Sequence, residues 1–266
     1  MYMLRFFQPA VLAGAVLSLL ILSVSIVRAS DEPTFDSPYQ PSADVMADVD
    51  AALAQAREED KLALIVMGAT WCHDSRGLVR RLRDEDIAGV IDERYVTLYV
   101  DVAHLEAARD VNKRFGMPAI YATPTVMVVD PETERLTNAR TMHQWRDADS
   151  ISYPHTREYF VTEAETARQS PAPMSAQLRA YYDAIDAFEA AQAARLVVGY
   201  DIIGPQLAMG RGNYPDGFEK LWGEARRFRY QLTDDLLALR AKAEELAAAG
   251  RSDALVFPSY PALSWE

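Results

Sequence analysis

The chain contains one cysteine, Cys72, within the stretch GATWCHDSRGL that runs from Gly68 to Leu78. A thiolate is the nucleophile of disulfide exchange and also a metal ligand, so this side chain is the first candidate for chemistry. Because no second cysteine exists, the chain cannot form an internal disulfide bond. Cys72 is therefore either a functional thiol or a small buried apolar residue.

The residues around Cys72 predict a turn between a strand and a helix. Leu62 to Met67, LALIVM, is a short apolar run typical of a central strand covered on both faces. Gly68 ends the run, and from Ser75 onward apolar residues recur at helical spacing as far as Ile87. Cys72 is thus expected at a helix N-terminus, where unpaired N–H groups and the helix dipole favour the thiolate.

The immediate neighbours of Cys72 have opposing effects on its sulfur. Trp71 is placed to shield one side of the sulfur, and the turn position favours an exposed thiol. Protonated His73 and Arg76 would add positive charge, whereas Asp74 would oppose them. The sum of these charges is left open by the sequence.

The flanking segments predict a small α/β layer. Residues 43–61 have apolar positions at helical spacing, and residues 95–102 alternate as a strand does. Residues 104–117 have a helical composition that ends near Gly116, and TVMVVD at 125–130 predicts another strand. Strand, helix, strand, helix and strand at this spacing indicate a sheet with at least one parallel pair.

These motifs resemble the thioredoxin superfamily over roughly Asp44 to Asp130. They are the apolar strand, the W-C-x-x-S sequence from Trp71 to Ser75, the helix ending in FGM, and Thr123-Pro124-Thr125 before a strand. The resemblance implies a central mixed sheet flanked by helices, with Cys72 as nucleophile. It also implies that Pro124 is a cis-proline beside the cysteine and shapes the substrate groove with Thr123, Trp71, His73 and Asp74. Without that fold, Pro124 would be an ordinary proline at a strand start.

Three features of the sequence depart from the pattern of the thioredoxin superfamily. Ser75 stands where dithiol thioredoxins have their second cysteine, and Val66 stands where they have a buried acid. The segment PAIYA also lengthens the loop before Pro124. A single thiol can form a mixed disulfide, but an external thiol must release it, which favours isomerisation, deglutathionylation-like exchange or thiol capture over net oxidation. Ser75 is expected either to hydrogen-bond the sulfur or to be an ordinary first-turn serine.

Residues 1–29 predict an export signal. Arg5 precedes an uncharged apolar run from Val11 to Val27, and Val-Arg-Ala at 27–29 suits signal peptidase cleavage. The alternative is an uncleaved membrane anchor through residues 11–27. Both place the body outside the cytoplasm, in the periplasm or an equivalent compartment. Cleavage removes two of the 27 basic residues and none of the 39 acidic ones, leaving a charge of −14 that would repel nucleic acid and anionic membranes.

The remaining chain divides into a linker at 30–43, a thioredoxin-like domain at 44–168 and a helical region at 169–266. SPAPM at 170–174 predicts a break, after which an amphipathic helix is expected to end at Gly199, Gly204 and Pro205. A second helical pattern continues from Phe218 to about Gly250, giving a helical hairpin. Its apolar stripes are expected to pack on each other and on the sheet, or alternatively to form a docking or dimerisation surface. The tail after Gly250 is expected to lie extended over the body.

The sequence thus predicts an exported protein with a thioredoxin-like fold and an appended C-terminal helical hairpin. Its leading function is monothiol thiol–disulfide exchange with protein or small-molecule thiols and disulfides, carried out by Cys72, Ser75 and Pro124. The rival is a catalytically retired fold that binds a partner through the hairpin. No cofactor is predicted, and no metal site, because His104, His143 and His155 share no ligand spacing.

Overall fold

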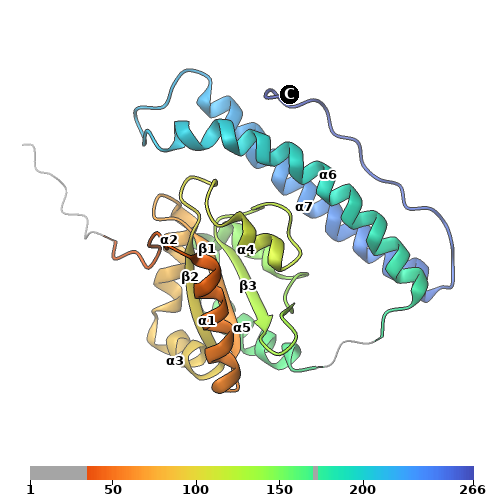
Figure 1. Ribbon diagram of the computed structural model, residues 1–266, viewed down its shortest axis with the longest axis horizontal. Coiled ribbons are helices and arrows are strands. Elements are labelled where there is room, and N and C mark those ends of the chain that lie inside the picture. The colour runs from red at the N-terminus through yellow and green to blue at the C-terminus, as the bar shows by residue number, and fades with distance from the viewer. Residues whose placement is uncertain (1–34, 170–172) are drawn as a thin grey trace, which may run out of the picture. The chain divides into compact units, whose positions relative to one another are not determined.

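The computed structural model describes residues 35–169 and 173–266 (Figure 1). The predicted export signal or anchor at residues 1–29 lies outside the described residues, as do residues 170–172 of the predicted SPAPM break. Among the helices in the described ranges, none combines the length and apolar character needed to cross a membrane. Residues 35–43 of the predicted linker contain no helix or strand.

A four-stranded mixed sheet forms the centre of the first domain. Its strands are β1 (Leu62–Gly68), β2 (Tyr95–Asp101), β3 (Thr125–Asp130) and the short β4 (Arg135–Leu136), in the order β2-β1-β3-β4. β1 pairs parallel with β2 and antiparallel with β3. Every residue of β1 is buried, as the uninterrupted apolar run predicts for a central strand.

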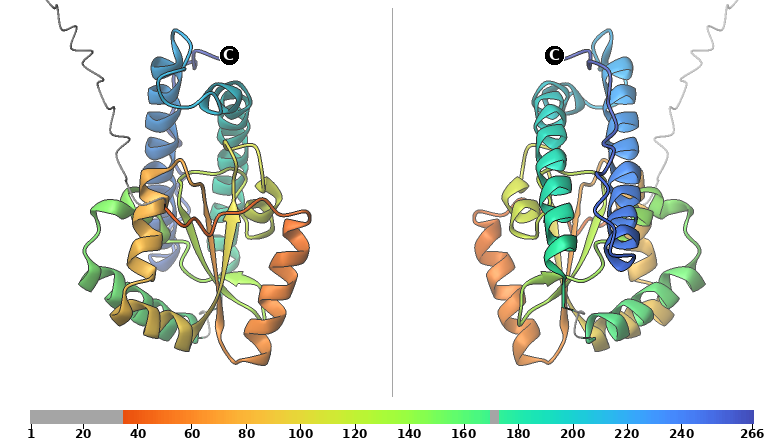
Figure 2. Two further views of the ribbon diagram at one scale, coloured as in Figure 1. Left: turned by 90° about the vertical axis from the view of Figure 1, so that its left-hand side faces the viewer. Right: turned by 90° about the vertical axis from the view of Figure 1, so that its right-hand side faces the viewer.

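Helices cover both faces of the sheet, as Figure 2 shows. On one face lie α1 (Val45–Glu58) and α4 (Arg109–Arg114). On the other face lie α2 (His73–Leu82), α3 (Glu85–Arg94), the 3₁₀ helix η1 (Met142–Ser150) and α5 (Tyr153–Ala167). The predicted thioredoxin-like mixed sheet flanked by helices is therefore confirmed.

Two predicted helices are shorter or more divided than the sequence suggested. The helix after Cys72 stops at Leu82, and a new helix begins at Glu85, because the Asp84 side chain accepts the N–H of Asp86 as an N-cap. Within 104–117 only Arg109–Arg114 is α-helical. The preceding residues are turned by Asp101, whose carboxylate accepts the N–H of Ala103, a local bond that competes with a helix.

The segment beyond Asp130 adds a strand and a helix to the domain. β4 pairs antiparallel with β3 and forms a short hairpin strand. α5 follows at Tyr153, where Ser152 caps the helix by accepting the N–H of His155.

The C-terminal region is a hairpin of two long helices, α6 (Ala176–Leu207) and α7 (Phe218–Ala248), packed against each other (Figure 1). The prediction that Gly199, Gly204 and Pro205 end the first helix is wrong, because α6 continues through all three to Leu207. The glycines instead permit close packing. A Cβ on Gly199 would lie 2.6 Å from the Trp265 ring, and one on Gly204 would lie 2.8 Å from the carbonyl oxygen of His104.

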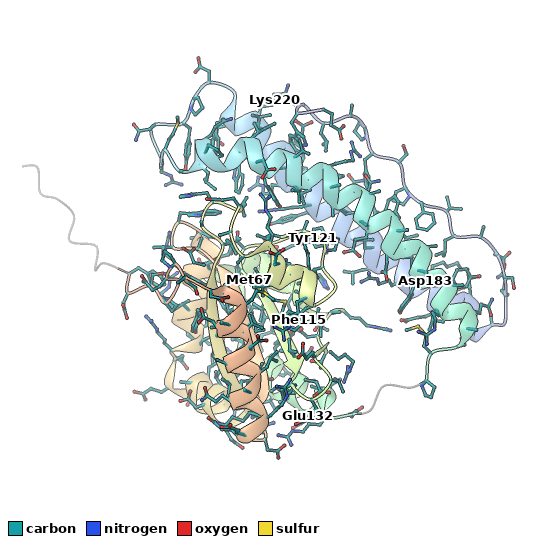
Figure 3. All side chains as sticks on the ribbon, in the orientation of Figure 1. Met67, Phe115, Tyr121, Glu132, Asp183 and Lys220 are labelled. Atoms are coloured by element: carbon teal, nitrogen blue, oxygen red, sulfur yellow. The ribbon has the colours of Figure 1, made fainter. Side chains whose placement is uncertain are left out.

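The hairpin contacts loops of the thioredoxin-like domain. The sequence analysis expected the apolar stripes of its helices to pack on the sheet. The hydroxyl of Tyr200 on α6 donates to the carbonyl of Ile120 at 2.6 Å. The Tyr121 hydroxyl donates to Glu189 at 2.9 Å, where the domain meets the hairpin (Figure 3). Burial raises the pKa of Glu189, although its ion pair with Arg240 at 2.7 Å opposes this effect.

The tail after Gly250 contains no helix or strand and runs along the hairpin (Figure 1). The indole N–H of Trp265 donates to the carbonyl of Arg195 at 2.9 Å. The Tyr260 hydroxyl donates to Asp235 at 2.7 Å. These contacts fit the expectation that the tail lies extended over the body, with the hairpin as its support.

The close approach at Gly204 gives a stability prediction. Gly204→Ala would press a methyl group against the His104 carbonyl, and overpacking of this kind costs about 1–3 kcal/mol. Gly89→Ala is the matched control, because a Cβ there has nothing within 4 Å and alanine is favoured over glycine in a helix by about 1 kcal/mol. Urea unfolding should show a lower midpoint for Gly204→Ala and an unchanged or higher one for Gly89→Ala. Equal midpoints would contradict the packing role of Gly204.

Candidate active site

Cys72 lies at the N-terminus of α2, immediately after the turn that follows β1. It is the N-cap residue of this helix, and its carbonyl accepts the N–H of Arg76 at 3.1 Å. Its own N–H donates to the carbonyl of Ala69 at 3.1 Å, which closes the turn. The helix start therefore falls where the sequence placed it, and the sulfur lies at the end of the sheet where β1 ends.

The thiol contacts the loop that leads into β3. The thiol of Cys72 donates to the carbonyl oxygen of Thr123 at 3.0 Å. The Thr123–Pro124 peptide bond is cis, which is the geometry that the sequence resemblance implies for this position. Cys72 is only 8% exposed, so the expectation of a freely exposed thiol is not met, although the residue still lines an open pocket.

The charged residues that follow Cys72 in the sequence are engaged in contacts that do not include its sulfur. The imidazole of His73 lies 2.7 Å from the carboxylate of Asp149, and the Asp74 carboxylate accepts the N–H of Asp149 at 3.0 Å. Arg76 donates to the carbonyl of Thr70 at 2.8 Å. The predicted groove residues His73 and Asp74 thus line the pocket while also tying α2 to η1.

The part of the chain that contains this site is similar to known proteins. Residues 44–131 match a family described as thioredoxin-like. Residues 44–131 therefore belong to the thioredoxin superfamily. Among solved structures, the chain is similar to a disulphide isomerase from Xylella fastidiosa Temecula1, with 26% identity over 47% of this chain and 95% of that chain and a TM-score of 0.44. No curated protein matches the chain.

Within this thioredoxin-like domain, Ser75 supports the turn and does not bond the sulfur. Its hydroxyl is fully buried and accepts the N–H of Ala69 at 3.4 Å. A Cβ added to Gly68 would lie 2.7 Å from the same hydroxyl oxygen, which shows how closely the turn packs. Of the two alternatives for Ser75, the structure shows the serine of the first helical turn, and the sulfur bonds the Thr123 carbonyl instead.

Trp71 lies at the boundary between the thioredoxin-like domain and the hairpin. Its indole N–H donates to the carbonyl of Ala103 at 2.6 Å, and its ring stacks near His104. The ring also meets Trp222 of α7 edge to face, with centroids 6.1 Å apart. Trp71 is therefore shared between the motif and the C-terminal helices.

The sequence analysis missed the contribution of α7 to the site. The pocket that contains Cys72 is also lined by Trp222, Arg229 and Tyr230 of this helix. Arg229 is 4% exposed and lies between the buried positions Phe228 and Leu232. A charged residue among the core-facing positions of an amphipathic helix was the signal in the sequence, because arginine is rarely buried without a partner or a function.

A metal-binding cluster is not found in residues 35–169 and 173–266, where no group of three histidine, cysteine, aspartate or glutamate side chains could hold an ion. Two of the other histidines lie in separate surroundings. His104 stacks near Trp71, and His155 hydrogen-bonds Gln144 at 2.8 Å.

The position of Ser75 gives a prediction that separates a structural role from a catalytic one. Ser75→Ala leaves the buried N–H of Ala69 without its acceptor, which costs about 1–3 kcal/mol of unfolding free energy. The rate of Cys72 alkylation by iodoacetamide should stay within about twofold of the unmodified protein, because the hydroxyl makes no hydrogen bond to the sulfur. A large change in alkylation rate with unchanged stability would instead place Ser75 in the chemistry.

Proposed function

We propose that the protein carries out monothiol thiol–disulfide exchange, isomerase-like or reductase-like, with Cys72 as the nucleophile. The observation that carries this proposal is the position of the chain's single thiol. It caps the first turn of α2 in a thioredoxin-like domain and opens onto a pocket of about 640 Å³. The unpaired N–H groups of the first helical turn stabilise negative charge that develops on the sulfur.

The exchange requires two displacements at sulfur. The Cys72 thiolate attacks one sulfur of a substrate disulfide, the substrate S–S bond breaks, and the departing thiolate takes up a proton. A second thiolate, from the substrate or from a small external thiol, then attacks the mixed disulfide and releases the Cys72 thiolate. Each step makes one S–S bond and breaks one, so the protein returns to its starting state without net oxidation.

The surrounding residues position the substrate for these displacements. Thr123 and Pro124 bring the backbone of the loop before β3 against the thiol, and Trp71 forms a wall of the pocket. His73 and Asp74 line the pocket beside them. Ser75 acts indirectly, because it holds the turn that presents Cys72.

A second function is favoured by a specific observation. The low exposure of Cys72 and its bond to the Thr123 carbonyl fit a retired thioredoxin fold that binds a partner. The outer side of α6 exposes Val198 by 49% and Ile202 by 40%, one helical turn apart, which gives such a partner an apolar contact.

The reactivity of Cys72 with a neutral disulfide distinguishes the two functions. The native protein is mixed with bis(2-hydroxyethyl) disulfide, and mixed-disulfide formation is followed by mass spectrometry, with the urea-unfolded chain as reference and Cys72→Ser as control. Exchange predicts that the native thiol reacts at least as fast as the unfolded one and is released by added thiol. A native rate more than about 100-fold slower, which corresponds to a local opening cost of about 2.8 kcal/mol, would establish the retired fold.

We also propose that the protein is exported and works in the periplasm or an equivalent compartment. The apolar run between Arg5 and Ala29 supports this proposal, with cleavage after Ala29 favoured over an anchor at residues 11–27. The N-terminal sequence of the protein isolated from its native cells should begin at Ser30. A chain recovered from the membrane fraction with Met1 retained would show the anchor, and an intact chain in the cytosol would contradict export.

A further inference from the structure

The pocket around Cys72 has walls from two parts of the chain. Trp71, Cys72 and Thr123 come from the thioredoxin-like domain, and Trp222 and Arg229 come from α7. Its volume of about 640 Å³ lies within the range of small-molecule sites, which is roughly 300–1,000 Å³. The thiol thus faces a space that can hold a whole small ligand.

Arg229 is a buried cation with free hydrogen-bond donors in this pocket. The side chain is 4% exposed, and within the described residues its Nε and Nη1 atoms have no hydrogen-bond partner. The guanidinium carbon lies 5.3 Å from the centre of the Trp222 ring and 5.4 Å from that of Tyr230. Aromatic rings satisfy the faces of a guanidinium but not the N–H groups in its plane, so these donors still require an acceptor.

The charge of Arg229 is maintained by its surroundings. Burial lowers the pKa of Arg229, but Tyr200, Tyr230 and Cys72 more than offset this effect and raise it above the ordinary value. Cys72 and Arg229 line the same pocket. A buried and permanently charged group with unsatisfied donors is costly unless an anion binds there.

The rim of the pocket carries further positive charge in a chain of formal charge −12. Arg211 and Arg226 also line the pocket, are exposed, and form no ion pair within the described part of the chain. Arg146 is paired with Asp147 and with Asp234.

Two further acids line the pocket. Asp74 already accepts the N–H of Asp149, and Glu219 lies exposed at the rim. Within the described residues, the pocket cations without an ion-pair partner are therefore the buried Arg229 and the exposed Arg211 and Arg226.

We propose that this pocket binds low-molecular-mass thiols and disulfides that carry carboxylates, with a carboxylate on Arg229 and the sulfur at Cys72. Carboxylate oxygens are the acceptors that match guanidinium donors in both charge and geometry. This proposal rests on the proposed exchange function, because it names the external thiol or disulfide that a protein with one cysteine needs to complete each cycle.

Binding is tested separately from chemistry with a probe that cannot react. The Cys72→Ser protein is titrated by calorimetry with 3,3′-thiodipropionate, a thioether with two carboxylates, and with its neutral diamide. The dicarboxylate should bind and the diamide should not. Arg229→Gln in the same background should weaken binding about tenfold or more, the effect of losing a charged hydrogen bond. Arg227→Gln, an exposed neighbour that does not line the pocket, should leave binding unchanged.

Exchange is tested with three disulfides of similar size and different charge. The native protein reacts with 3,3′-dithiodipropionate, bis(2-hydroxyethyl) disulfide and cystamine, which are anionic, neutral and cationic. The anionic disulfide should react fastest, and Arg229→Gln should reduce its advantage over the neutral one, with Arg227→Gln as control. If Arg229→Gln does not fold, the exposed pair Arg211→Gln and Arg226→Gln supplies the same comparison.

The outcomes separate this inference from the proposed function. Equal rates for the three disulfides together with no binding of 3,3′-thiodipropionate would overturn the carboxylate pocket while leaving exchange intact. Binding of 3,3′-thiodipropionate that depends on Arg229, without reaction of any disulfide, would support the pocket and overturn exchange.

Discussion

The close packing of α6 against two loops of the domain, the one after β2 and the one before β3, is the contact on which the site depends. Gly204 lets the helix backbone approach the His104 carbonyl, and the Tyr200 hydroxyl binds the Ile120 carbonyl in a fully buried setting. The loop that contains Ile120 continues to Thr123, whose carbonyl accepts the hydrogen bond from the thiol. This interface therefore positions both the hairpin, which lines the pocket of Cys72, and the loop whose Thr123 carbonyl bonds the thiol. A shift of α6 would alter both.

Much of the first domain was predictable because its determinants are local. LALIVM contains no polar residue and forms a strand buried on both faces, and Cys72 lies at the strand-to-helix turn that the pattern indicated. The length of α6 was not predictable in this way. Gly204 looks like a helix end in the sequence, yet its role is decided by a carbonyl in a distant segment. The same limit applies to Ser75, whose partner depends on how tightly the turn closes around Gly68.

The altered motif and the appended hairpin compensate for each other. Ser75 removes the resolving thiol, and Val66 leaves the position behind the motif without a carboxylate, so the domain alone has few polar groups with which to direct a reaction. The hairpin supplies what the domain lacks, because Arg229 and Trp222 of α7 complete the pocket. The sequence analysis missed Arg229 because it interpreted the apolar stripe of α7 as a packing or docking surface and not as part of the pocket of Cys72.

The hydrogen bond from Cys72 to the Thr123 carbonyl has a kinetic consequence. In this rotamer the sulfur points at a carbonyl oxygen of its own chain, and that oxygen occupies the approach that a substrate sulfur would need. The sulfur must therefore swing away before it attacks, so the observed rate is the intrinsic rate multiplied by the fraction of molecules in the released rotamer. Each 1.4 kcal/mol that favours the held rotamer slows the reaction about tenfold. A ligand whose binding favours the released rotamer would therefore raise the rate of its own reaction.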